Sequence, residues 1–414
     1  MKKKFLSAFL CMGIVMSTFV GCKTTNKENN EKTTVASQTE ETSARVTSES
    51  DATKDGETGN DSFKNDSING DGTAIDGRYD GDGAAKDEAK NHETEASLME
   101  YFNDYTFIKQ QKKKESHYIF NMRAMNDLER ECGIEDIEKY WNGFIDALLE
   151  GRTEFECPDK EVFSYIYYVL IPDNLPAVAE WLDMPWDQEV EDGTVHFTYK
   201  ISTEELKEKI EIQKNETEKI LNEVLEDDYS DFEKALALYI YFQDNFYYYE
   251  DYSEWGGVMH VLKTKSGICG EFAMTYTYLL TQAGVDAGTV TNNGHCWSIV
   301  RIKGKYYHID TTWALGHTDL VHFMQTKSQK LDANNDGGDE DTIDCWMADF
   351  KASYGRYYPY NDFDDEDDSC AALWRYFSKV KWNREEKRLY IYSEYNDDGE
   401  YDPKITEFDY SKFE

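Results

Sequence analysis

The chain has 414 residues, and its 83 acidic side chains against 44 basic ones give a formal charge of −39. That length allows two or three domains with a buried core, whereas the charge argues against docking through a positive surface on nucleic acid or anionic lipid. Aromatic residues make up 14% of the chain, which excludes disorder throughout.

The first 22 residues predict export. Lysines at positions 2–4 precede an uncharged, mostly apolar run over residues 5–20, which is short for a membrane-spanning helix and typical of a signal peptide. Small residues directly before Cys22 resemble the bacterial lipobox, after which the cysteine is lipidated. We therefore predict a signal peptide over residues 1–21 and a lipid anchor at Cys22 on the outer face of a bacterial membrane. The alternative is an ordinary secretory signal with a chance cysteine.

Residues 22–97 predict a disordered acidic tether. They are rich in Thr, Ser, Asn, Asp, Glu and Gly, and their only aromatic residues are Phe63 and Tyr79. Such a segment has too little apolar surface to offset the loss of chain entropy. We expect it to hold the folded part away from the membrane.

The first folded segment, residues 98–202, is predicted to mix helix and strand and has no assigned role. Apolar residues at helical spacing predict a helix over residues 134–149, and alternation predicts a strand over residues 194–201. Two long helices are then expected between residues 203 and 245, with Ser202 and Ser230 as caps.

A cysteine follows these helices in a setting that favours a reactive thiol. Gly267 and Gly270 flank Cys269, a helical stretch covers residues 271–283, and Gly284 suits the C-terminal cap. Cys269 is therefore predicted at a helix N-terminus, where unpaired N–H groups and the helix dipole stabilise a thiolate.

A hairpin comes next. If Ile302 pairs with Lys305, then His295 and Asp310 lie on one face as diagonal neighbours, about 7–8 Å apart between backbones. An imidazole and a carboxylate can close that gap with a hydrogen bond. Cys296 falls on the opposite face, so we predict it in the core rather than as a second nucleophile.

These three groups predict acyl-transfer chemistry. The Cys269 thiolate attacks a carbonyl, His295 holds and later delivers the proton, and Asp310 fixes the imidazole tautomer. The N–H of Cys269 is the natural first donor to the oxyanion. The second donor and the walls of the substrate cleft stay open; the candidates are Gly270, Trp297, Trp313 and Trp255 for the cleft, and Tyr248, Tyr249 and Trp255 for the donor. The alternative is a buried cysteine, a satisfied core histidine and a strand-end aspartate.

The last segment, residues 331–414, is predicted to add strands and acidic loops that complete the domain. Residues 332–337 match the first half of a calcium loop, but Ile343 stands where its bidentate acid belongs. We therefore expect an acidic turn over residues 332–344, with calcium binding as the alternative. Two disulfides are possible in an exported chain, Cys132–Cys157 and Cys345–Cys370. No CxxC pair is present, so a structural zinc site is not expected, and no cofactor is predicted.

Four motifs resemble the transglutaminase-like superfamily of papain-type cysteine enzymes: Gly267-Ile-Cys269-Gly-Glu-Phe-Ala273, Ala283-Gly284-Val285, Gly294-His295-Cys-Trp297 and Lys305-Tyr-Tyr307-His-Ile-Asp310-Thr-Thr-Trp313. The order Cys, His, Asp matches, and the resemblance covers about residues 230–330. It implies an α+β fold in which the helix that carries the cysteine packs on an antiparallel sheet that carries the histidine and the aspartate. The chain departs from the family at Cys296, where alanine is usual, and at Glu271, whose charge we expect to oppose the thiolate modestly.

We therefore predict a surface lipoprotein with a catalytic core over residues 203–330. It would act on amide bonds of a protein or peptide through a thioester, by hydrolysis, glutamine deamidation or amine transfer. Hydrolysis is slightly favoured, because many bacterial relatives are peptidases. The alternative is a non-catalytic surface module that binds cell-wall polymer or a host protein.

Overall fold

The computed structural model describes residues 94–103, 114–184, 190, 192–249, 256–292, 295–333, 344–345, 367–375, 379–396 and 399–414. They belong to one of the two compact units into which the chain divides. Several predictions fall outside the described residues: the signal peptide, Cys22, Trp255, the tether up to residue 93 and most of the acidic loop. Helix α2 (Glu95–Asn103) begins within the last residues predicted as tether. None of the described helices is both long and apolar enough to cross a membrane.

The segment after residue 114 is mostly helical. Helix α4 (Ile137–Glu150) confirms the helix predicted there, and it ends at Gly151, whose φ is 69°. The other elements are short: α3 (Asp127–Arg130), β1 (Glu154–Glu156), α5 (Lys160–Tyr165), the π-helix η2 (Ile166–Leu170), α6 (Ile171–Asn174), α7 (Pro176–Ala179), β2 (Leu182–Asp183), β3 (Thr194–His196) and β4 (Thr198–Tyr199). Their buried side chains form one hydrophobic cluster with Trp141 and Phe144.

The strand predicted over residues 194–201 is wrong as a single element, because it is split at Phe197. Strand β3 pairs with β1, whereas β4 pairs with β2. Between them the Phe197 ring is buried, and its centroid lies 5.9 Å from that of Phe144. The buried Phe197 ring fits the predicted alternation, so the structure differs from the prediction in the pairing partner and not in which side chains face inward.

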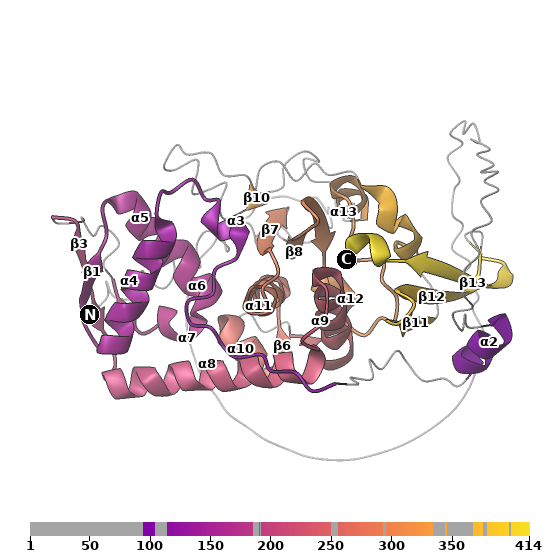
Figure 1. The fold of residues 1–414 in the computed structure, drawn as a ribbon, viewed down its shortest axis with the longest axis horizontal. Helices are drawn as coiled ribbons and strands as arrows, with labels where there is room; N and C mark the ends of the chain where they lie inside the picture. The colour runs from indigo at the N-terminus through magenta and orange to yellow at the C-terminus, as the bar shows by residue number, and fades with distance from the viewer. Residues whose placement is uncertain are drawn as a thin grey trace, which may run out of the picture. The chain divides into compact units, whose positions relative to one another are not determined.

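The two long helices are confirmed as α8 (Thr203–Val224) and α9 (Asp231–Asn245). Ser202 and Ser230 cap them as predicted, each accepting a hydrogen bond from the backbone of a glutamate three residues on. Helix α8 packs against α7 and α10 (Gly257–Thr264) (Figure 1). Strand β5 (Tyr247–Tyr248) follows α9 and pairs in parallel with β6 (Ser266–Gly267).

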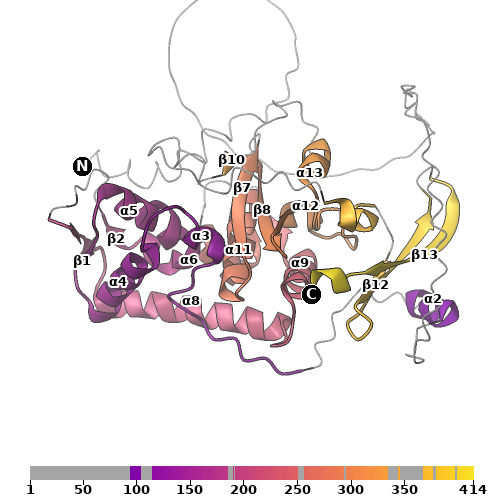
Figure 2. The same cartoon turned by 45° about the horizontal axis from the view of Figure 1, so that its top comes forward.

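The central sheet has the order β10-β7-β8-β9 and is antiparallel throughout: β10 (Asp344–Cys345), β7 (Ala287–Asn292), β8 (His295–Ile302) and β9 (Lys305–Ile309). Ile302 pairs with Lys305, so the predicted register is confirmed. Helix α11 (Cys269–Gln282) packs on β7 and β8 (Figure 2). On the opposite face, Trp297 and Ile299 join the hydrophobic cluster of the N-terminal segment.

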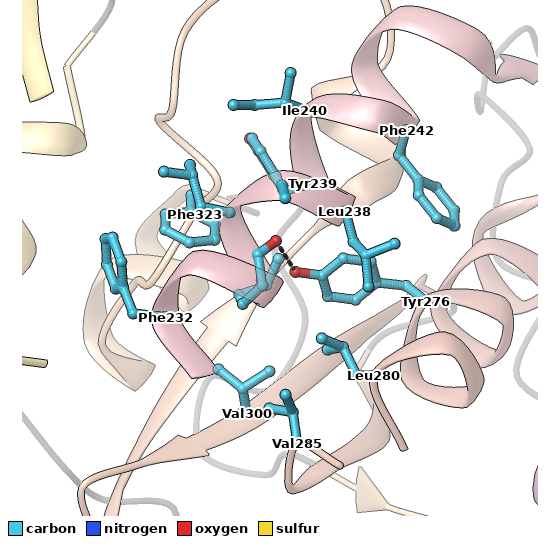
Figure 3. Close-up of a cluster of buried hydrophobic side chains, with 14 of the residues drawn as sticks. Phe232, Leu238, Tyr239, Ile240, Phe242, Tyr276, Leu280, Val285, Val300 and Phe323 are labelled. Carbon is cyan, nitrogen blue, oxygen red and sulfur yellow. Dashed lines mark hydrogen bonds between the residues drawn. The ribbon is translucent and has the colours of Figure 1, made fainter. Parts of the chain in front are cut away.

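The main core lies between α9, α11 and the sheet. Figure 3 shows Phe232, Leu238 and Phe242 of α9 in the same cluster as Tyr276 and Leu280 of α11. The Tyr276 hydroxyl donates to the backbone carbonyl of Ala235 at 2.8 Å, which satisfies its polar group inside the core. This packing fixes the axis of the helix that begins at Cys269.

The C-terminal part adds a second antiparallel sheet, β11 (Lys379–Asn383), β12 (Arg388–Tyr395) and β13 (Tyr401–Asp409), with the short helices η5 (Asp368–Leu373) and η6 (Ser411–Phe413). Glu233 of α9 joins this part to the core. It forms ion pairs with Arg384 and Lys387 at 3.1 Å each and accepts a hydrogen bond from Tyr410.

Neither disulfide suggested by the sequence forms. Cys132, Cys157 and Cys370 are buried and take part in no disulfide. The side chain of Cys345 lies outside the described residues. Cys132 and Cys157 belong to the same hydrophobic cluster, where they pack as small apolar side chains.

Candidate active site

Cys269 is the first residue of α11, as predicted. Its side chain is nearly buried, with 4% exposure. No described residue accepts a hydrogen bond from its backbone N–H. The helix N-terminus therefore offers an unpaired donor beside the sulfur.

The Glu271 carboxylate, which we expected to oppose the thiolate, accepts three hydrogen bonds from backbone N–H groups. One carboxylate oxygen accepts from the backbone N–H groups of Gly256 and Gly257 at 3.0 and 2.9 Å, and the other accepts from Ile268 at 3.1 Å. Burial raises the pKa of Glu271, although these N–H groups oppose the rise. The side chain thus ties the start of α10 to the residue that precedes Cys269.

Gly267 is required by this same arrangement. A Cβ at this position would lie 2.8 Å from Cγ2 of Val261 and 3.0 Å from Oε2 of Glu271. Glycine here makes room for the packing of α10 and the Glu271 carboxylate. In the structure this glycine therefore serves the local packing.

His295 lies between Cys269 and Asp310. Its Nε2 is 2.6 Å from Oδ2 of Asp310, across the diagonal that the register predicted. The ring also lies beside the Cys269 sulfur, because each of the two groups shifts the pKa of the other. Because Nε2 is engaged by Asp310, Nδ1 is the ring nitrogen left for the sulfur.

Asp310 is fully buried and accepts four hydrogen bonds. Oδ1 caps α12 (Thr311–Ala314) through the N–H groups of Thr312 and Trp313, at 2.9 and 3.2 Å. Oδ2 binds His295 and also the Nζ of Lys330, at 2.5 Å, from α13 (Lys327–Ala333). Lys330 is fully buried as well, and its Nζ lies 4.8 Å from the ring centre of Trp297.

These contacts set the charges of the site. Burial would raise the pKa of Asp310, but the charges of Lys330 and His295 hold it well below its usual range. Burial lowers the pKa of His295, but the charge and hydrogen bond of Asp310 outweigh this and raise it to about 9. A hydrogen bond from Cys296, opposed by burial and aided by His295, lowers the pKa of Cys269 to about 5. Between these two values the pair is a thiolate and an imidazolium.

Cys296 contacts the nucleophile candidate, which the sequence interpretation missed. Its side chain does point to the opposite strand face from His295, and it is buried as predicted. That face, however, is the one covered by α11, and the two thiols form a small cluster with Ala273. The contact with Cys269 and burial raise the pKa of Cys296, so it stays a thiol and donates.

The predicted cleft residues differ in exposure. Trp297 is 1% exposed and does not line an open surface. Its Nε1 donates a hydrogen bond to Nδ1 of His308 at 2.9 Å, and its ring stacks against that of His295. Gly270 is also buried. Trp313 is 51% exposed and stands edge-on to the His295 ring, 6.0 Å between centroids. Tyr248 and Tyr249 are partly exposed and lie on or next to β5, which places them beside Gly267.

Residues 218–311 match the family model of the transglutaminase-like superfamily. This part of the chain is a transglutaminase-like domain. Members of that superfamily include cysteine-dependent enzymes and inactive proteins. A search of curated proteins finds no match to the chain.

The transglutaminase-like domain holds Cys269, His295 and Asp310, whereas Lys330 lies beyond its matched range. Nothing in the local pattern of residues 327–333 singles out that lysine, because it is one of several polar residues on a short helix. Among the described residues, no group of three or more His, Cys, Asp or Glu side chains is arranged to hold a metal ion.

Proposed function

We propose that the chain is a cysteine enzyme that acts on amide bonds of proteins or peptides. The observation that supports this most is the contact series from the Cys269 sulfur through His295 to Asp310, at the N-terminus of α11. The domain match adds a superfamily in which such chemistry is common.

In the proposed reaction the Cys269 thiolate attacks the carbonyl carbon, and the N–H of Cys269 donates to the oxyanion. The C–N bond breaks as the His295 imidazolium gives its proton to the leaving nitrogen, which leaves a thioester on Cys269. A second nucleophile then attacks the thioester, His295 takes its proton, and the thiolate is regenerated. Water as nucleophile gives hydrolysis or deamidation, and an amine gives a cross-link.

We favour water slightly as the acceptor, in line with the resemblance to bacterial peptidases. The test is a peptide library incubated with the protein and followed by mass spectrometry, with Cys269→Ala as the control. Cleavage products or a mass increase of about one dalton at glutamine would identify water as the acceptor, whereas amine adducts would identify an amine. A library unchanged by the wild-type protein, with Cys269 reacting like an ordinary cysteine, would favour the non-catalytic binding module instead.

We also propose that the chain is exported and anchored at Cys22. The support is the apolar run that ends in small residues before that cysteine. Expression in a bacterium, followed by membrane fractionation of wild type and Cys22→Ala, tests this. Loss of the variant from the membrane fraction is expected, and equal membrane retention would contradict the anchor.

A further inference from the structure

We propose that Cys296 is the resolving thiol of Cys269, so that oxidation links the two residues in a reversible disulfide that closes the active site. This goes beyond the amide-bond chemistry, which needs only one thiol. The inference rests on the placement of two free thiols against each other on packed elements.

The packing of α11 on β8 sets this placement. Ser298 of β8 donates to the backbone carbonyl of Ala273 at 3.1 Å, and Thr277 bonds to the Ser298 hydroxyl at 3.2 Å. One helical turn before Ala273 is Cys269, and two residues before Ser298 on the same strand face is Cys296. The same faces of α11 and β8 therefore meet again at the start of the helix, and there the facing groups are the sulfurs of Cys269 and Cys296.

The side chains at this point are small. Cys269, Ala273 and Cys296 form a cluster of their own, and both cysteines are free and buried. Small side chains let the helix approach the strand closely, which a disulfide requires. The three other buried thiols described, Cys132, Cys157 and Cys370, belong to other clusters and serve as internal controls.

The chemistry balances with a peroxide as oxidant. The Cys269 thiolate attacks one oxygen of hydrogen peroxide, so that an S–O bond forms and the O–O bond breaks. The second oxygen leaves as hydroxide, which His295 protonates to water. Cys296 then attacks the oxidised sulfur: an S–S bond forms, the S–O bond breaks, and the hydroxyl leaves with the Cys296 proton as water. A dithiol reductant returns two electrons and restores both thiols.

The test uses the full chain, reduced, treated with hydrogen peroxide and then blocked with N-ethylmaleimide. No Lys or Arg lies between Lys265 and Arg301, so trypsin leaves both cysteines on one peptide. We expect that peptide to lose two hydrogens and to take up no maleimide, and chymotrypsin to split it into two peptides joined by a disulfide. Dithiothreitol should restore two maleimide groups.

The matched variants are Cys296→Ala and Cys296→Ser, each checked for folding by circular dichroism. Without the second thiol, Cys269 should accumulate sulfenic acid that dimedone traps, and it should reach the irreversible sulfinic form about tenfold faster than in wild type. Equal rates of irreversible oxidation in wild type and variants, with Cys296 still alkylated, would overturn the proposal. So would linkage of Cys269 to another cysteine.

The readout is a mass and does not depend on turnover. A disulfide in a protein that leaves the peptide library unchanged would contradict the proposed enzyme and support this inference. A protein that cleaves the library but forms no link would do the reverse.

Discussion

Asp310 in the candidate active site and Glu129 in the N-terminal segment are both buried carboxyl groups, but their pKa values move in opposite directions. Asp310 faces Lys330 and His295, which hold its pKa well below the usual range. Glu129 accepts hydrogen bonds from the Asn126 backbone at 2.7 Å and from the Asn174 amide at 2.6 Å. Burial outweighs these neutral donors and raises the pKa of Glu129 to about 7.

The difference shows what a buried carboxylate needs in order to stay charged. Two short hydrogen bonds from neutral groups do not replace the hydration that burial removes, whereas a buried cation does. Asp173 behaves like Glu129 and unlike Asp310, because burial and the charge of Glu129 raise its pKa. The ionised Asp310 is the state that can hold His295 as an imidazolium.

The largest expected effect comes from removing the charge of Asp310. Asp310→Asn keeps the shape but cannot stabilise the imidazolium, so the rate of peptide-bond hydrolysis should fall by up to about 10⁴-fold. The measurement is the turnover of a cleaved library peptide at pH 7. An unchanged rate would mean that His295 does not depend on this carboxylate.

Lys330→Met should have an effect nearly as large as that of Asp310→Asn, but on the stability of the fold and not on the reaction rate. It leaves Asp310 buried with one cationic partner fewer, so the free energy of unfolding should fall by about 3–5 kcal/mol. Urea denaturation at pH 7 measures this. The double variant Lys330→Met/Asp310→Asn is the control, and it should lose less than the two single losses combined. Strict additivity would show that the two side chains do not interact.

Glu271→Gln tests a third buried carboxylate, to be compared with those of Asp310 and Glu129. The amide keeps one acceptor oxygen and must lose at least one of the three backbone hydrogen bonds, so the free energy of unfolding should fall by about 1–3 kcal/mol. Glu205→Gln changes the equivalent, exposed carboxylate of the α8 cap and is the matched control. Equal losses in the two variants would contradict the role of burial at Glu271.

The smallest effect is the pH dependence that Glu129 adds. Because its pKa is raised in the folded state, the proton it binds contributes stability that is fully present below the unfolded pKa and lost as pH rises through about 7. Relative to Glu129→Gln, the wild type should therefore lose up to about 2.5 kcal/mol of unfolding free energy between pH 5 and 8. Urea denaturation across this range measures it, and a constant difference would contradict the raised pKa.

The sequence predicted the parts of the site that are local. The glycine setting of Cys269 indicated a helix start, and the assumed pairing of Ile302 with Lys305 predicted the hairpin register that joins His295 to Asp310. Contacts across long chain separations could not be predicted this way. Lys330 comes from a helix without a pattern, and the role of Cys296 depends on which sheet face α11 covers. The segment across Phe197 keeps the predicted alternation of buried and exposed residues, but it pairs with β1 before that residue and with β2 after it, a change of partner that local alternation cannot predict.

The most direct measurement of the central claim is the pH dependence of Cys269 alkylation by iodoacetamide, followed by mass spectrometry in wild type and His295→Ala. The thiolate–imidazolium pair predicts rapid alkylation that persists down to about pH 6 in wild type and a midpoint that moves toward the ordinary cysteine value, about 8.5, in the variant. A wild-type midpoint already near that ordinary value, unmoved by the loss of His295, would contradict the account.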